Sequence, residues 1–269
     1  MFRNLTPVTK NILLLNITIY IAGLVLSSKG INLGDLLGAH YINSALFEPY
    51  QVVTHMFMHD LSSPFHIFFN MFLLVMFGAH LERIWGAKRF FFFYIASGLG
   101  AYLLYNSIGF YQLYELKNVL TAAGNDITTV ENYILEGSLS PFQGGQSFVA
   151  HAQQLVIEGK LSPSVLNEDL QNLYDYSGFT MTSMVGASGA LFGLLAGFAM
   201  LFPNTQLMLL FPPIPIKAKY LIGGYIIFEV VNSISQQNSQ IAHLAHVGGA
   251  IVGIIIILIW RRRDRKNFY

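Results

Sequence analysis

The chain contains no cysteine and few charged residues. The absence of cysteine excludes disulfides, metal sites with thiolate ligands and cysteine nucleophiles. Charged residues make up 11% of the 269 residues, against about 25% in an ordinary soluble domain. Hydrophobic residues make up 54% and the mean hydropathy is +0.51, so lipid is the expected solvent for most of the chain. The net charge of +1 by itself says nothing about partners, and we expect no nucleic-acid partner.

Six stretches are long and apolar enough to cross a hydrocarbon core of about 30 Å, which takes about 20 residues. They lie near residues 11–27, 65–81, 88–105, 183–202, 217–234 and 243–260. A soluble protein buries one or two helices that are apolar all round, whereas six indicate a membrane protein. The first stretch has no small-residue cleavage site at its end, so we expect it to be retained as a helix. The predicted fold class is therefore an all-α membrane protein, a bundle of six transmembrane helices.

The lysines and arginines indicate the orientation of these spans. Twelve of the fifteen fall on one side of the predicted topology, next to the ends of the spans. Because lysine and arginine concentrate in cytoplasmic segments, both termini are predicted to be cytoplasmic. The expected location is the inner (plasma) membrane of a bacterium.

A long polar segment, residues 106–180, separates the third predicted span from the fourth. It carries eight acidic residues against two lysines, a net charge of −6. Leucines at helical spacing predict helices in it, and so does Ser162-Pro163, a helix cap followed by proline in the first turn. We expect three domains. These are residues 1–105 with three spans and a membrane-associated first outer loop, residues 106–180 as a helical insertion outside the membrane, and residues 181–269 with three spans and a basic tail.

Four polar side chains fall near the outer ends of the even-numbered spans, which all enter from the same side of the membrane. They are Ser188 in the fourth span, His246 in the sixth, and His66 and Asn70 in the second. Polar residues inside spans are costly and mark functional sites. At about 1.5 Å per residue, all four are expected within about 10 Å of the outer ends of their helices. The topology thus predicts that they lie at one depth.

Ser188 lies in the sequence Gly186-Ala187-Ser188-Gly189, in the first turns of a predicted helix. The free N–H groups and the dipole at the start of a helix favour negative charge, which a tetrahedral acyl-transfer intermediate carries on its oxyanion. Small residues in this pattern also occur where membrane helices merely pack together, so the motif by itself leaves both interpretations open.

His66 and Asn70 are four residues apart, so their side chains share one face of a helix. Both donate hydrogen bonds, as an oxyanion hole requires, although a contact between helices would use the same residues. His246 precedes Gly249 and Gly253, a Gly-x-x-x-Gly face that lets two helices pack closely. Packing against the glycine-rich fourth span would bring His246 to Ser188, where a neutral imidazole is the usual base.

Taken together, these motifs resemble the rhomboid intramembrane serine proteases. Further matching residues are Glu82-Arg83 and Gly86 between the second and third spans, and Pro49-Tyr50-Gln51 and Thr54-His55 with His59 in the first loop. The resemblance covers every predicted span, and the order and spacing of the motifs make it specific. Residues 106–180 depart from the compact core of the family.

The resemblance implies a dyad of Ser188 and His246 with no carboxylate as a third member. His66, Asn70 and the backbone N–H of Ser188 would hold the oxyanion, with Gly186 and Gly189 beside the nucleophile. Phe192 would stack on His246, at a position where family members often carry tyrosine. The loop around Ser233–Gln240 would cover the site.

The activity that the resemblance implies is cleavage of single-span membrane proteins near the outer membrane face, with the lipid bilayer as the other partner and no cofactor or metal. One alternative is a non-proteolytic rhomboid-like protein for membrane binding or quality control, but such proteins typically lack the serine or the histidine. Another is a small transporter or channel, which would spread ionisable residues across the bilayer, whereas only Glu229 lies deep.

Glu229 is the one carboxylate expected in the middle of a span. We expect it to be protonated or paired with a polar neighbour such as Asn232, and a role in proton transfer stays open. His243 lies three residues before His246, but the pattern places no carboxylate beside it, so no metal site is predicted. His55 and His59 are expected to order the first loop by hydrogen bonding.

Overall fold

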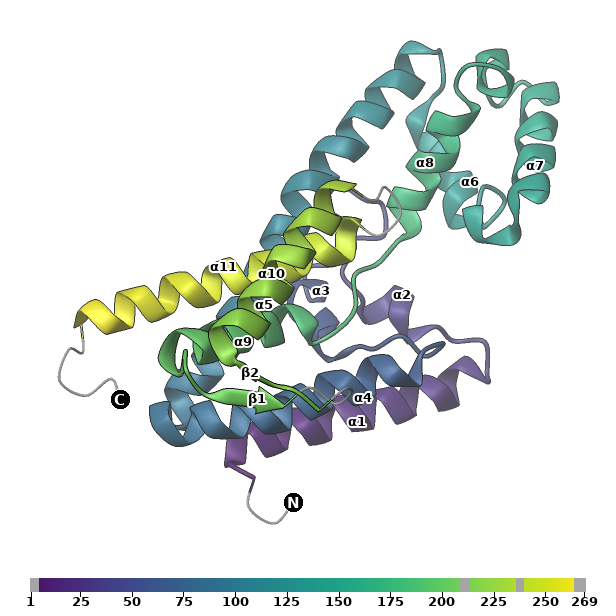
Figure 1. Cartoon of the computed structure of the whole chain (residues 1–269). Coiled ribbons are helices and arrows are strands. Elements are labelled where there is room, and N and C mark those ends of the chain that lie inside the picture. The colour runs from purple at the N-terminus through teal and green to yellow at the C-terminus, as the bar shows by residue number, and fades with distance from the viewer. Residues whose placement is uncertain (1–4, 209–212, 236–239, 264–269) are drawn as a thin grey trace. The chain divides into compact units, whose positions relative to one another are not determined.

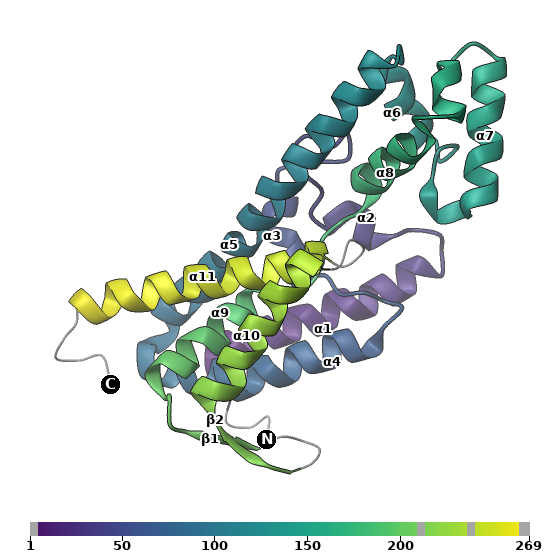
Figure 2. The ribbon, with the colours of Figure 1, turned by 45° about the horizontal axis from the view of Figure 1, so that its top comes forward.

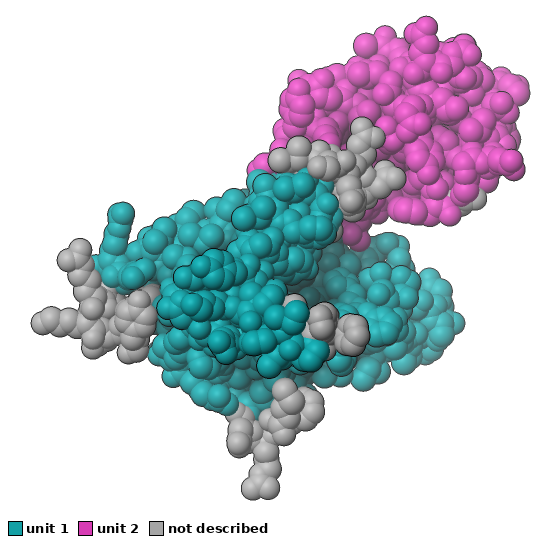
Figure 3. Space-filling view, viewed as in Figure 1, with its two compact units in different colours: residues 1–39, 50–105, 184–269 teal, residues 40–49, 106–183 magenta. Residues whose placement is uncertain are grey.

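The computed structural model describes residues 5–208, 213–235 and 240–263, and nearly all of their regular structure is helical (Figure 1). The chain forms two compact units (Figure 3). Unit 1 comprises residues 1–39, 50–105 and 184–269, and unit 2 comprises residues 40–49 and 106–183. The boundary between the units falls within helix α5 (Ala79–Ala122), of which residues 79–105 belong to unit 1 and residues 106–122 to unit 2.

Unit 1 contains most of the long apolar helices. Its helices are α1 (Pro7–Ser27), α2 (Leu33–Leu37), α3 (Gln51–Thr54), α4 (Pro64–Leu73), the first part of α5 (Ala79–Ala122), α9 (Ser188–Leu201), α10 (Ala218–Ser235) and α11 (Gln240–Arg263). A 3-10 turn, η2 (His55–Phe57), follows α3, and a π-helical turn, η3 (Leu74–Gly78), joins α4 to α5. A small antiparallel ribbon of β1 (Gln206–Met208) and β2 (Pro215–Lys217) pairs Leu207 with Ile216. The ribbon was not expected from the sequence.

Three described helical runs are long and apolar enough to cross a membrane: Pro7–Ser27, Pro64–Ala122 and His243–Arg263. The run Pro64–Ala122 contains both the second and the third predicted spans. They are divided at Gly86, whose φ of 77° lies in the left-handed region that glycine adopts without steric cost. The helix α9 has 14 residues, fewer than the roughly 20 that a full crossing takes. The count of six spans therefore stays a prediction.

The helix α9 forms the centre of unit 1. Eleven of its fourteen residues are buried. By contrast, large apolar side chains on the other long helices are exposed, among them Ile21 on α1, Phe65 on α4 and Ile227 on α10. An apolar exterior around a buried helix is the arrangement expected of a bundle in lipid.

Glycine lets α9 and α11 pack at very short range. A Cβ atom at Gly249 would overlap the carbonyl group of Gly189, and one at Gly253 would lie 2.8 Å from the Cα of Gly193. No side chain other than hydrogen fits at these two positions of α11. The predicted close packing of the sixth span on the fourth is confirmed.

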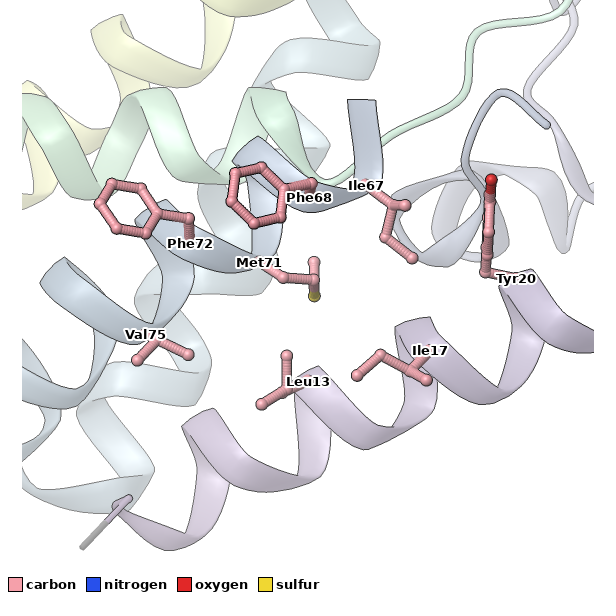
Figure 4. Close-up of a pocket in the computed structure, with 8 residues that line it drawn as sticks. All are labelled: Leu13, Ile17, Tyr20, Ile67, Phe68, Met71, Phe72 and Val75. Atoms are coloured by element: carbon pink, nitrogen blue, oxygen red, sulfur yellow. The ribbon is translucent and has the colours of Figure 1, made fainter. Parts of the chain in front are cut away.

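The helices α1 and α4 run side by side in both views (Figures 1 and 2). Between them lies a cavity of about 460 Å³, which Figure 4 shows with the residues that line it. Leu13, Ile17 and Tyr20 come from α1, and Ile67, Phe68 and Met71 come from α4. Its lining is apolar apart from the hydroxyl of Tyr20, so it offers no groups for catalysis. The start of α1 is fixed separately, because the Glu82 carboxylate accepts from the backbone N–H groups of Val8 and Thr9 at 2.9 and 2.8 Å.

Unit 2 is a small helical body with its own core. It contains the end of α5, then α6 (Ile127–Leu135), η4 (Pro141–Gln143), α7 (Gly145–Ile157), η5 (Pro163–Leu166) and α8 (Leu170–Met181). Its fully buried side chains include Leu120, Ile134 and Phe148. The predicted helices are present, but residues 106–122 continue α5 and do not form a separate helix. Ser162 caps as expected, although the helix that it starts is a four-residue 3-10 turn.

Candidate active site

Ser188 is the first residue of α9. The sequence placed it about five residues inside the span, but the helix starts later because Gly186 has a φ of 126°, which no helix accommodates. The first N–H groups of an α-helix have no partner within the helix, so the Ser188 N–H is available to an anion. The Gly186 N–H donates to the carbonyl of His55 at 3.0 Å and fixes the segment before the serine.

His246 on α11 lies directly beside the serine. Its Nε2 is 2.9 Å from the Ser188 Oγ. The ring of Phe192, one turn further along α9, stacks on the imidazole with centroids 4.3 Å apart and planes 7° apart. The stacking that the resemblance implied is therefore present, and it fixes the plane of the imidazole.

A carboxylate contacts the other side of the same imidazole. The Glu229 Oε2 lies 2.9 Å from the His246 Nδ1 and 2.6 Å from the His243 Nδ1. Glu229 is thus paired with polar neighbours, which was one of the expected alternatives, but these are histidines of α11 and not Asn232. The expectation that no carboxylate lies near His243 is wrong. The reason is geometric: His243 and His246 are three residues apart and share the face of α11 that meets α10, so both reach one oxygen.

His66 and Asn70 on α4 border the serine from a third helix. A Cβ atom at Gly186 would lie 3.1 Å from the His66 Nε2 and 3.5 Å from the Ser188 Oγ. The side chains of His66 and Ser188 therefore both border the space beside this glycine. The Asp60 N–H donates to the His66 Nδ1 at 3.4 Å, which assigns the proton of a neutral ring to Nε2. The Asn70 side chain is buried, and its Nδ2 has no hydrogen-bond partner among the described residues.

All four polar residues that the sequence singled out line one cavity of about 270 Å³. Its lining comes from α4, α9, α10 and α11, and includes Phe65, Phe69, Phe192 and Tyr225 beside the polar groups. A nucleophile with a base, two side-chain donors and a helix start converge on this space. The arrangement has the parts that acyl transfer needs.

The segment between α1 and α4 packs against the residues of this site. His55 is buried, its Nδ1 lies 2.9 Å from the Gln51 carbonyl, and burial lowers its pKa to about 4. The His59 ring lies 5.2 Å from that of His66, and burial followed by the charge of His66 lowers the pKa of His59 to about 3. Both loop histidines are therefore neutral at pH 7, and His55 orders the loop as predicted.

Glu229, His243 and His246 also form the described group whose ligand atoms lie close enough for a metal, all within 4.8 Å of one another. The sequence argument against a metal assumed that no carboxylate was near, and Glu229 corrects that premise. Two ligands of one zinc ion lie about 3.3 Å apart, since zinc bonds to nitrogen and oxygen are about 2.0–2.2 Å long in a tetrahedron. The measured separations of 2.6 and 2.9 Å are hydrogen-bond distances.

The sequence model of the rhomboid domain matches residues 46–121 and 153–263, which is more than half of the chain. The chain belongs to the rhomboid family. It is also similar to the rhomboid protease AarA of Providencia stuartii, with 25% identity over 264 residues, covering 94% of this chain and 72% of that protein. Family membership and the apolar helices together make this rhomboid an integral membrane protein. The gap in the family match, residues 122–152, lies inside unit 2 and is shorter than the insertion predicted from the sequence.

Glu229 is the rhomboid site residue whose contacts the sequence did not predict. A lone carboxylate in a span needs a partner, and the histidines at the start of the next span are the nearest donors in an antiparallel pair of helices. This pairing of a carboxylate with histidines on the next span was the signal in the sequence that could have predicted the contact. Half of the loop expected to cover the site, Ser233–Gln240, lies outside the described residues, namely residues 236–239.

Proposed function

We propose that this rhomboid is an intramembrane serine endopeptidase with Ser188 as nucleophile and His246 as general base. The observation that carries the proposal is the 2.9 Å separation of the His246 Nε2 and the Ser188 Oγ. A serine hydroxyl is a weak nucleophile unless an adjacent base accepts its proton. The similarity to a named rhomboid protease supports the same reaction class.

The reaction follows from the positions of these groups. The His246 Nε2 takes the Ser188 hydroxyl proton as Oγ attacks the scissile carbonyl carbon. The oxyanion then accepts hydrogen bonds from the Ser188 N–H, the His66 Nε2–H and the Asn70 Nδ2–H. His246 gives this proton to the leaving amine as the C–N bond breaks. Water then attacks the acyl ester while His246 takes a proton from it, and His246 passes that proton to the Ser188 Oγ as the ester bond breaks.

The proposed substrates are single-span membrane proteins cleaved near the outer membrane face. His246 lies near the start of α11, whereas Arg261, Arg262 and Arg263 lie in its last turn. The fifteen residues from His246 to Arg261 span about 22 Å at a rise of about 1.5 Å each. Since arginine clusters mark the cytoplasmic side, the catalytic pair belongs toward the opposite side, in what we propose to be a bacterial inner membrane with both termini cytoplasmic.

The test uses Ser188→Ala and His246→Ala in the full chain. Each variant should lose cleavage of a membrane substrate and covalent labelling by a fluorophosphonate, while remaining folded in the membrane. Because the two residues act as a unit, the double variant should be no less active than either single variant. Retained cleavage by Ser188→Ala would overturn the proposal. An unlabelled, inactive wild-type protein would favour the alternative, a non-proteolytic rhomboid-like binding protein.

A further inference from the structure

Glu229 lies in the second half of α10, and only 3% of its surface is exposed. A carboxylate inside a membrane protein is costly unless hydrogen bonds or opposite charge compensate it. Here a single oxygen, Oε2, contacts the Nδ1 atoms of two histidines. A buried carboxylate with these contacts is expected either to hold two helices together or to act in the active site beside it.

The geometry favours a role of Glu229 in the active site. His246 has one ring nitrogen 2.9 Å from the nucleophile and the other 2.9 Å from the carboxylate. An acid, an imidazole and a serine hydroxyl in that order form the arrangement of a serine-hydrolase triad. Phe192 stacks parallel to the imidazole and removes its freedom to tilt, so the two hydrogen bonds fix its remaining rotation.

Resting on the proposed function, we propose that Glu229 is the third member of a Ser188–His246–Glu229 triad, acting as a positioning residue. The carboxylate accepts the Nδ1–H of His246 and so assigns the ring proton to Nδ1. The Nε2 lone pair is then free to accept the Ser188 proton. When that proton arrives, the imidazolium carries a positive charge 2.9 Å from Oε2, and the carboxylate stabilises it without taking a proton itself.

His243 has a supporting part in this arrangement. Its Nδ1 lies 2.6 Å from the same Oε2, from a side chain that is 18% exposed. A second donor restricts where the oxygen sits, so Oε2 stays in line with the His246 Nδ1. The His243 ring makes no described contact with Ser188, and its effect on the reaction passes through Glu229.

The main test is Glu229→Gln, measured as kcat and KM on one membrane substrate with the full chain in lipid vesicles. Glutamine keeps the size of the side chain but offers an amide donor to Nδ1, which moves the ring proton to Nε2, the atom that must be free. The expected result is a loss in kcat of up to about 10⁴-fold, as when a triad carboxylate becomes an amide, with KM and Tm nearly unchanged. Glu229→Asp, which keeps the charge, should recover part of the lost kcat.

Two matched variants separate this role from helix packing. Asn232→Ala changes a polar side chain less than one turn from Glu229 on α10 and should leave kcat unchanged. His243→Ala should lower kcat about tenfold, because Oε2 keeps its bond to His246 and loses one donor. A wild-type kcat in Glu229→Gln overturns the triad. So does a result in which Glu229→Gln and Glu229→Asp both lower Tm and Glu229→Asp recovers none of the lost kcat. Ser188→Ala is run beside them: if it is inactive while Glu229→Gln is fully active, the triad fails and the serine protease stands.

Discussion

Asn70 carries a buried amide nitrogen without a hydrogen-bond partner among the described residues. Leaving such a donor unsatisfied costs roughly 1–3 kcal/mol of stability. We propose that this side chain, which bears the cost in the resting protein beside Ser188, is a donor for the charge that appears during the reaction. His66 differs, since it also lines the cavity but its Nδ1 already accepts from the Asp60 N–H.

Asn70→Ala should therefore lower kcat by about 10²–10³-fold, the usual loss for one oxyanion-hole donor. It should not lower Tm, because the change removes an unsatisfied buried group. Turnover of a membrane substrate and thermal unfolding measure the two effects on one sample. Labelling of Ser188 by a small fluorophosphonate should persist at a reduced rate. Unchanged turnover would mean that Asn70 only joins helices.

At this scale the sequence predicts the residues that carry local signals. Ser188 lies between Gly186 and Gly189 in the first turns of a predicted helix, and His246 precedes a Gly-x-x-x-Gly face, so both are visible in short motifs. Glu229 has no motif, because its partners lie 14 and 17 residues away on the next helix and meet it only after the helices pack. The expected pairing with Asn232 considered neighbours along α10, whereas the decisive neighbours lie across it.

Among the helices, the contact between α9 and α11 determines whether the base reaches the nucleophile. The backbone of Gly249 lies against that of Gly189, one residue after Ser188, and three residues separate Gly249 from His246. A displacement at this crossing moves the imidazole relative to the serine. The catalytic distance thus depends on glycines that perform no chemistry.

Gly249→Ala should separate the two helices and break the contact between His246 and Ser188. Overpacking of this kind typically costs about 1–3 kcal/mol, so both Tm and labelling of Ser188 should fall. Gly223→Ala is the control, since a Cβ atom at Gly223 on α10 meets nothing within 4 Å. Equal labelling of the two variants would show that α9 and α11 tolerate more separation than the glycines suggest.

Helix ends were less predictable than helix positions. Hydropathy placed the fourth span from residue 183, but apolar character does not report backbone angles, and Gly186 delays the helix to Ser188. The same limit applies at Gly86, where one φ value divides a run that is otherwise continuous. The short ribbon β1–β2 has three-residue strands, too short for an alternating pattern to indicate them.

For the whole molecule, unit 2 contains none of the residues placed at the site. It holds together through its own contacts, including those of residues 40–49 with its helices. The Ser44 hydroxyl donates to the Thr180 carbonyl at 2.9 Å, and the Tyr41 ring lies 6.0 Å from that of Phe179. The sequence predicted a folded helical body here but could not assign residues 40–49 to it, because that contact joins segments far apart in the chain.

Replacing residues 106–180 with a Gly/Ser linker of about 20 residues, which spans about 25 Å on average, should leave unit 1 folded. The deletion variant also carries Tyr41→Ser, because the Tyr41 ring loses its contact with Phe179 when the linker replaces that segment. A variant with Tyr41→Ser alone is the control. Labelling of Ser188 by a fluorophosphonate should stay within a few-fold of wild type, while cleavage of a membrane substrate changes in rate or selectivity. If a well-folded variant loses labelling, unit 2 is part of the active site.

The length of α9 has a physical consequence for the membrane around it. Its 14 residues rise about 21 Å, roughly 9 Å less than the hydrocarbon layer is thick. We infer that one end of the helix stops inside the apolar layer and that this is the Ser188 end, which opens on polar groups and a cavity. The depth of the reacting serine is then set partly by the acyl chains outside the protein. Longer chains place it further from bulk water, and shorter chains bring it nearer to the surface.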